Sequence, residues 1–300
     1  MWWKNVVLSF LIILLVACGQ EESKQKPEAK MKSPTEDRVQ VRLLTKGLLP
    51  DKDNVIRVGL HFEMAEDWHI YWKNPGDSGL PTRVDWTLPE GYSAGPILWP
   101  TPHSFEQPGE IQGYGYSDEV LLIVDIQALE SQSLDKTIRM EADVNWLACA
   151  DVCIPGGSRL VSLVETSGED TNKYIDVFDK YEAQLPKSLD ENNPPFTVSR
   201  YQWPRQTDQS GAVEVALDWN ISAQDVAFFP HPADALLIEN LSFSHQEESS
   251  TIRIDLNYLK PQDKPRWLDS VIGYRNESGD WRGISQKIPL QPGLIEIKSQ

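Results

Sequence analysis

The fold class is decided by residues 56–62, which read Ile-Arg-Val-Gly-Leu-His-Phe. Apolar residues occupy every second position of this stretch. A period of two is typical of a β-strand that has one buried face and one solvent-exposed face. Runs of the same kind, rich in β-branched and aromatic residues and separated by Pro, Gly, Asn and Asp, recur on both sides of it. The sequence therefore predicts an all-β fold.

These runs form two series, and a segment of different character separates them. The first series comprises residues 39–44, 55–62, 69–72, 84–88, 120–126, 137–146 and 159–164, and the second comprises 197–203, 213–219, 236–243, 251–256, 268–274 and 281–288. Between Asn172 and Leu185 apolar residues recur at helical spacing, which predicts an amphipathic packing helix that Pro186 ends. We expect two immunoglobulin-like β-sandwich domains, at residues 39–168 and 195–300, joined by a short helical linker at 169–194.

The net charge and the absence of certain motifs argue against several classes of function. The 300-residue chain has a formal net charge of −17, and so acidic a surface repels phosphate backbones. General binding of nucleic acid is therefore excluded. The sequence also lacks a βαβ alternation, a glycine-rich phosphate loop and a GxSxG elbow, which argues against nucleotide-dependent enzymes and α/β hydrolases.

The first residues are typical of an export signal. An apolar run from Val6 to Val16 is too short to span a bilayer but fits the core of a secretory signal. Residues 15–18, Leu-Val-Ala-Cys, resemble the bacterial lipobox, so we expect removal of residues 1–17 and lipid on Cys18. An ordinary signal peptide is the alternative. Gln20 favours the outer membrane where the organism has two membranes, and residues 18–38 have the composition of a flexible tether.

Cys149 and Cys153 form the pair on which the chemistry depends. An exported protein meets an oxidising environment, so the default for two nearby cysteines is a disulfide. The bridge requires the chain to turn between them, and Asp151 is a suitable turn residue. A loop this short contributes only about 2 kcal/mol as a structural staple. Redox exchange is therefore favoured over a structural bridge, with Cu(I) binding by the two thiolates as a third possibility.

Five motifs in order resemble the N-terminal periplasmic domain of the thiol:disulfide interchange protein DsbD, and more closely its ScsB-like relatives. They are residues 68–79 (Trp-His-Ile-Tyr-Trp-Lys-Asn-Pro-Gly-Asp-Ser-Gly), 81–86, 99–100 (Trp-Pro), 113–114 with 119–120 (Gly-Tyr with Glu-Val) and 149–155. The resemblance implies an immunoglobulin-like sandwich with an exchangeable cysteine pair. Residues 227–230, Ala-Phe-Phe-Pro, resemble the second β domain of the ScsB-like members less strongly.

The resemblance also implies a set of site residues. Cys149 and Cys153 would be catalytic, and the loop with Asn74 and Asp77 would be either a cap over the cysteines or only a turn. Tyr114 and Tyr116 are candidates to pack beside the thiols, although tyrosines in strands are more often half-buried sheet residues. Asp151, between the sulfurs, would disfavour the thiolate. His61 and His69 are interpreted as ordinary strand histidines.

The sequence thus predicts a protein thiol–disulfide oxidoreductase that is lipid-anchored in the bacterial cell envelope, faces the periplasm and uses no cofactor or metal. Members of the family continue into a cysteine-bearing membrane-spanning domain and a terminal thioredoxin-like domain, and the 300 residues contain neither. We therefore expect exchange with a separate membrane-embedded thiol–disulfide reductase and with envelope disulfide proteins. A non-catalytic binding or adaptor lipoprotein with a structural disulfide, or Cu(I) handling, is the alternative.

Overall fold

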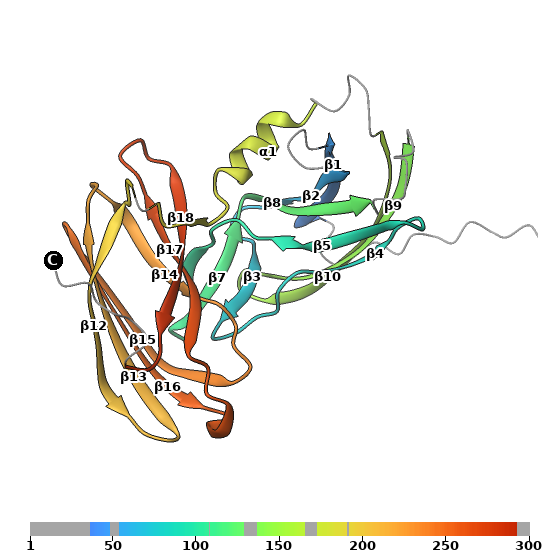
Figure 1. Ribbon diagram of the computed structural model, residues 1–300. Coiled ribbons are helices and arrows are strands. Elements are labelled where there is room, and N and C mark those ends of the chain that lie inside the picture. Colours follow the sequence, from blue (N-terminus) through green and yellow to red (C-terminus); the bar gives the residue numbers. More distant parts are fainter. Residues whose placement is uncertain are drawn as a thin grey trace, which may run out of the picture. The chain divides into compact units, whose positions relative to one another are not determined.

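Strands dominate the computed structural model, which describes residues 37–48, 54–107, 109–128, 137–165, 173–190 and 192–292 (Figure 1). The expected all-β class is confirmed, with immunoglobulin-like sheets and a single α-helix in the described ranges. The expected signal peptide and Cys18 lie outside the described residues.

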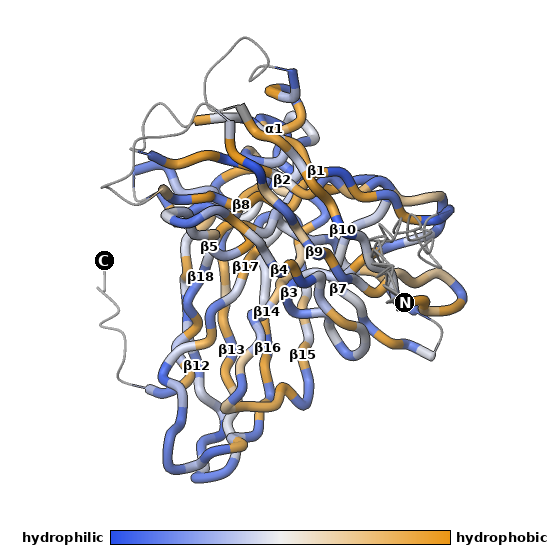
Figure 2. The backbone as a smooth tube through the Cα atoms, turned by 90° about the vertical axis from the view of Figure 1, so that its right-hand side faces the viewer, coloured by the Kyte–Doolittle hydropathy of each residue, from blue (hydrophilic) through white to orange (hydrophobic). Residues whose placement is uncertain are grey.

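Two sheets form the first sandwich. The strands of one, in the order in which they pair, are β1 (Val39–Leu48), β2 (Val55–Met64), β8 (Glu119–Ala128) and β5 (Tyr92–Leu98). Those of the other are β10 (Cys153–Glu165), β9 (Thr137–Cys149), β3 (His69–Gly76), β7 (Ile111–Ser117) and β6 (His103–Gln107), with β4 (Arg83–Thr87) also paired to β9. Figure 2 shows apolar and polar segments alternating along the strands, and the apolar residues meet between the sheets.

The second sandwich also consists of two sheets. One contains β11 (Lys187–Ser188), β18 (Trp281–Pro289), β17 (Trp267–Arg275) and β14 (Gln224–Pro230), in pairing order. The other contains β12 (Phe196–Gln206), β13 (Ser210–Trp219), β16 (Ser249–Tyr258) and β15 (Leu236–Gln246). A short 3-10 helix, η2 (Pro261–Asp263), precedes β17.

The helix α1 (Ile175–Glu182) lies beside β8 and is shorter than the predicted 172–185 segment (Figure 1). Its fully buried Phe178 joins the core of the first sandwich. Glu182 on α1 accepts ion pairs from Lys46 at 2.9 Å and from Arg57 at 3.1 Å. The exposed face that alternation predicts for β2 is therefore largely covered, and His61 on that face is only 4% exposed. The alternation of apolar residues within β2 cannot show that a helix distant in the sequence covers the outer face of the strand.

The cores of the two sandwiches meet. Phe229, Val271 and Trp281 of the second sandwich belong to the same buried cluster as Trp72 and Tyr114 of the first. The indole Nε1 of Trp281 donates to the carbonyl of Thr101 at 3.1 Å. Both sandwiches fall within one compact unit. The predicted domain boundaries at residues 168 and 195 remain a prediction about independent folding.

Candidate functional site

The two cysteines face each other on either side of the turn of the β9–β10 hairpin. Cys149 ends β9, Cys153 begins β10, and the two are register partners with Cα atoms 4.1 Å apart. Their sulfurs form a disulfide. The chain turns between them, and the N–H of Ala150 donates to the carbonyl of Val152 at 3.1 Å. Asp151 lies exposed in this turn.

The two sulfurs have unequal access to solvent. Cys149 is completely buried, because β9 is an interior strand and His69 of β3 is its register partner on the far side. Cys153 is exposed on β10, which is at the edge of the sheet, and the adjacent Val152 is 60% exposed. A thiol from another protein would therefore reach the sulfur of Cys153 first.

The hydroxyl of Tyr71 points at the bridge. It donates to the Sγ of Cys149 at 3.1 Å and lies 4.0 Å from the Sγ of Cys153. The amide Nε2 of Gln107 donates to the same hydroxyl at 2.5 Å. Burial raises the pKa of Tyr71, and the hydrogen bond from Gln107 partly offsets this shift. The hydroxyl therefore stays protonated at neutral pH and remains a donor to the sulfur.

Residues of the β6 strand pack against His69 and Tyr71, and they are called the cover below. The ring of Phe105 lies 4.0 Å from that of His69 and 5.9 Å from that of Tyr71, measured between centroids. The Nε2 atoms of Gln107 and His69 are 3.1 Å apart. Burial lowers the pKa of His69 to about 4, so its ring is neutral at neutral pH and Nε2 accepts from the Gln107 amide. His69 and Gln107 thus orient the Tyr71 hydroxyl.

A glycine permits Phe105 to take this position. A Cβ atom on Gly113 of β7 would lie 2.2 Å from the Cε2 atom of Phe105. Gly79 has the same role beside Tyr71, because a Cβ there would lie 2.4 Å from the Cε1 atom of its ring. Both aromatic side chains therefore pack directly on the backbone.

The tyrosines singled out from the sequence lie elsewhere. Tyr116 is buried and donates to the carbonyl of Pro100 at 2.7 Å, and burial raises its pKa. Tyr114 packs edge-on against Phe229 of the second sandwich, with centroids 5.4 Å apart. The position beside the sulfurs that the sequence analysis considered for them belongs to Tyr71.

The 74–77 segment does not supply the contacts to the sulfurs either. The side-chain amide of Asn74 donates to the carbonyl of Pro230 at 2.8 Å, and Asp77 accepts from the N–H of Gln112 at 2.9 Å. Strand β3 continues to Gly76. The pairing of β3 with β7 is irregular between Tyr71 and Gly76, and Asn74 lies in this interval. The side chains that contact Tyr71 beside the disulfide, Phe105 and Gln107, come from β6.

The sequence contained a signal for part of this site. In the predicted strand 69–72, His69 and Tyr71 share one face of the strand. If one of them lies near the sulfurs, the other is therefore expected to lie on the same side. Phe105 and Gln107 carried no comparable signal, because residues 103–107 were not predicted to form a strand.

Comparison with known proteins agrees with this geometry. Residues 45–165 match the family model described as "Thiol:disulfide interchange protein DsbD, N-terminal". The chain carries a DsbD N-terminal-like domain. This DsbD N-terminal-like domain is of the thiol–disulfide exchange type, and the Cys149–Cys153 pair lies within the matched residues.

One solved structure extends the fold comparison over both sandwiches. It is the N-terminal periplasmic domain of ScsB from Proteus mirabilis, with a TM-score of 0.61, 17% identity, and coverage of 87% of this chain and 97% of that one. At this identity the likeness shows the fold alone. None of the curated protein sequences is similar enough to count as a match.

Two further features bear on the site. In the parts of the chain that the structure describes, no cluster of three or more His, Cys, Asp or Glu side chains is placed to hold a metal ion. In the same parts, no helix is long and apolar enough to cross a membrane.

Proposed function

We propose that the DsbD N-terminal-like domain exchanges its Cys149–Cys153 disulfide with separate proteins of the bacterial cell envelope. It would pass reducing equivalents between a membrane-embedded reductase and envelope disulfide proteins, facing the periplasm from a lipid anchor on Cys18. The observation that carries the proposal is the asymmetric bridge, with Cys153 exposed and Cys149 buried under a hydroxyl donor. A merely structural bridge has no need of this asymmetry.

The geometry supports a definite order of steps. A thiolate of the reductase attacks the Sγ of Cys153, and the S–S bond breaks so that its electron pair leaves on the Sγ of Cys149. The Tyr71 hydroxyl, 3.1 Å away, stabilises this leaving thiolate. A second thiol of the reductase then attacks the mixed disulfide and releases Cys153. The pair gains two electrons and the reductase becomes the disulfide.

The reduced pair returns its electrons to a target by the same steps in reverse. The Cys153 thiolate attacks a disulfide of the target and forms a mixed disulfide, which Cys149 resolves. The rate depends on access to Cys153 and on the orientation of Tyr71. The cover formed by Phe105 and Gln107 is therefore expected to limit reaction with thiols that do not dock.

Single cysteine substitutions test the proposal in cells that express the full chain. Cys149→Ser leaves the exposed attacking sulfur without its resolving partner, and it should accumulate a reductant-sensitive adduct of higher mass after alkylation trapping. Cys153→Ser leaves only the buried sulfur and should trap at least severalfold less. The double substitution is the control and should trap nothing.

The opposite outcome is equally clear. If neither single variant forms an adduct, and the purified bridge is reduced only at potentials below about −300 mV, the bridge is structural and the exchange function is wrong. Equal trapping by both single variants would contradict the assignment of Cys153 as the attacking residue.

A further inference from the structure

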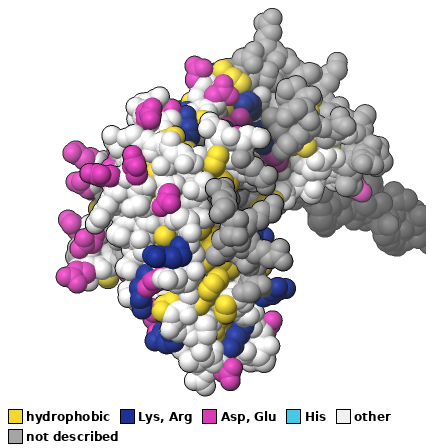
Figure 3. All heavy atoms as spheres, turned by 60° about the vertical axis from the view of Figure 1, so that its left-hand side comes forward, with side chains coloured by type: hydrophobic (Ala, Val, Ile, Leu, Met, Phe, Trp, Pro, Cys, Tyr) yellow, Lys and Arg dark blue, Asp and Glu magenta, His cyan; other side chains and the backbone are white. Residues whose placement is uncertain are grey.

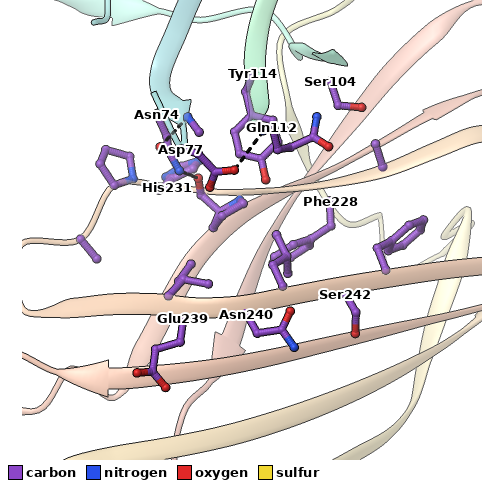
Figure 4. A pocket seen from close by; sticks show the side chains of 18 of the residues that line it. Asn74, Asp77, Ser104, Gln112, Tyr114, Phe228, His231, Glu239, Asn240 and Ser242 are labelled. Carbon is purple, nitrogen blue, oxygen red and sulfur yellow. Dashed lines mark hydrogen bonds between the residues drawn. The ribbon is translucent and has the colours of Figure 1, made fainter. Parts of the chain in front are cut away.

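A groove with a volume of about 920 Å³ lies where the end of the β3–β7 pair approaches the second sandwich (Figure 4). Asp77, Gln112 and Tyr114 line one side of it. The other side is formed by β14 and by residues 236–243 of β15, and Figure 4 shows Glu239, Asn240 and Ser242 there. Neither cysteine lines the groove, although Ser104 of β6 does.

Strand β15 brings an open edge to this groove. It is the last strand of its sheet and pairs with β16 alone among the described strands. A two-residue turn joins the register pair Gln246 and Ser249. In such a hairpin the backbone groups of Gln246, and of every second residue that precedes it in β15, form hydrogen bonds with β16. The backbone N–H and C=O groups of Leu241 and Phe243 therefore point outward, toward the open side of the sheet.

Within the described residues, the other long edges of this sandwich are obstructed and the edge of β15 is not. Strand β12, at the opposite edge of the same sheet, contains Pro204 and two register shifts. Strand β14 ends in Pro230. Prolines and lysines on an edge discourage the addition of a further strand. Residues 236–243 contain no proline, lysine or arginine, and their one register shift lies near the start of the strand.

The groove has the length and charge for one kind of occupant. Eight consecutive residues of β15 line it, which corresponds to about 26 Å of extended chain. Its lining contains the carboxylates of Asp77 and Glu239 and no lysine or arginine. Burial, aided by the charge of Lys73 and opposed by Asp269, lowers the pKa of His231 to about 4, so this histidine does not balance them.

Basic side chains do occur elsewhere on the surface, as Figure 3 shows for the face that it presents. Their absence from the groove lining is therefore a local property. The acidic lining disfavours a second copy of this chain, because pairing two β15 edges would bring the same carboxylates together in a protein of net charge −17.

We propose that this groove binds an extended, cationic peptide segment of about eight residues, which adds to the open edge of β15 as a further strand. The outward backbone groups of Leu241 and Phe243 supply the hydrogen bonds, as in other cases of strand addition. Asp77 and Glu239 select lysine or arginine in the segment. The exposed Leu237 and the nearby Phe228 provide apolar contacts. The proposal does not depend on the exchange reaction.

The test uses the full chain and a labelled, end-blocked octapeptide that alternates lysine and valine. A matched peptide with glutamate in place of lysine is the first control. We expect saturable binding of the lysine peptide that is at least tenfold tighter than that of the glutamate peptide. Hydrogen exchange of the backbone amides in residues 236–246 should slow when the lysine peptide is bound, most of all at Leu241 and Phe243, whose amides point toward the added strand.

Two substitutions locate the site. Glu239→Lys should weaken binding about tenfold by replacing attraction with repulsion, and Asn240→Trp should abolish it by filling the groove. Glu90→Lys makes the same charge change at an exposed position in the first sandwich and should have little effect. Circular dichroism and the thermal midpoint check that each variant is folded.

Three results would overturn the proposal. They are no saturable binding of the lysine peptide, equal binding by the Glu239→Lys and Glu90→Lys variants, or binding without protection of residues 236–246. Protection of these amides that rises with protein concentration in the absence of peptide would assign the edge to a second copy of the chain instead.

Discussion

At the scale of single residues, the Tyr71 hydroxyl makes the two sulfurs of the disulfide chemically unequal. It contacts the Sγ of Cys149 at 3.1 Å and stands 4.0 Å from that of Cys153. Charge that develops on Cys149 when the bridge opens is therefore stabilised more than charge on Cys153. Gln107 donates to the same hydroxyl, which leaves the Tyr71 proton directed at the sulfur.

Replacing Tyr71 by phenylalanine should slow reduction of the bridge by dithiothreitol about tenfold. A hydrogen bond to a charged group contributes about 1.5–3 kcal/mol, and about 1.4 kcal/mol of barrier corresponds to a factor of ten. Tyr201→Phe is the matched control, because it removes a hydroxyl that accepts from Gln286 in the second sandwich. Equal reduction rates for the wild type and Tyr71→Phe would show that the hydroxyl does not assist the leaving sulfur.

At the scale of elements, alternation predicted many of the regular strands and missed the short strand β6 and the glycine-containing strand β7. Strands β2, β8 and β9 lie close to their predicted ranges, whereas β10 begins at Cys153, six residues before the predicted start at residue 159. Strand β7 was missed because Gly113 and Gly115 break its pattern. Those glycines are what its packing requires, since a Cβ on Gly115 would lie 2.1 Å from the carbonyl oxygen of Ile70. The feature that conceals the strand in the sequence is the one that lets it pack.

The candidate site was predictable to a similar extent. The cysteine pair and the turn between them followed from residue type and spacing. Its cover did not, because Phe105 and Gln107 come next to His69 and Tyr71 only through the pairing of β6 with β7 and of β7 with β3. Pairings between distant strands leave no mark in a local pattern.

Gly113→Ala should open the cover and make reduction of the bridge by dithiothreitol severalfold faster. The added methyl group would meet the Phe105 ring at 2.2 Å, so the ring must leave its place beside His69 and Tyr71. Gly283→Ala is the control, because it introduces a similar clash with Thr101 between the sandwiches. It should reduce stability and leave the reduction rate unchanged. An unchanged rate in Gly113→Ala would mean that Phe105 does not restrict access.

At the scale of the whole molecule, β3 connects the disulfide to the second sandwich. Its successive residues Tyr71 and Trp72 point to opposite sides, Tyr71 to the sulfurs and Trp72 to Phe229, at a centroid distance of 6.1 Å. The sequence predicted two sandwiches but not their shared core, because residues as distant in the chain as Trp72 and Phe229 form it. The shared core predicts that the two sandwiches unfold together.

Phe229→Ala tests this coupling. Phe229 is completely buried and contacts Trp72 and Tyr114, so its truncation should cost about 3–5 kcal/mol, much of it from contacts between the sandwiches. Hydrogen exchange measured along a guanidinium titration reports residues 39–165 and 196–289 separately. In the wild type both segments should lose protection at the same denaturant concentration, and in Phe229→Ala at different ones.

A second buried phenylalanine separates loss of coupling from simple loss of stability. Phe196 is also completely buried, but it packs against Trp219 within the core of the second sandwich alone. Phe196→Ala should therefore lower the midpoint for both segments together, because the contacts of Phe229 remain and still transmit the destabilisation. Two separate transitions in the wild type would show that the two sandwiches unfold independently. Coincident transitions in Phe229→Ala would show that the coupling does not depend on the contacts of Phe229.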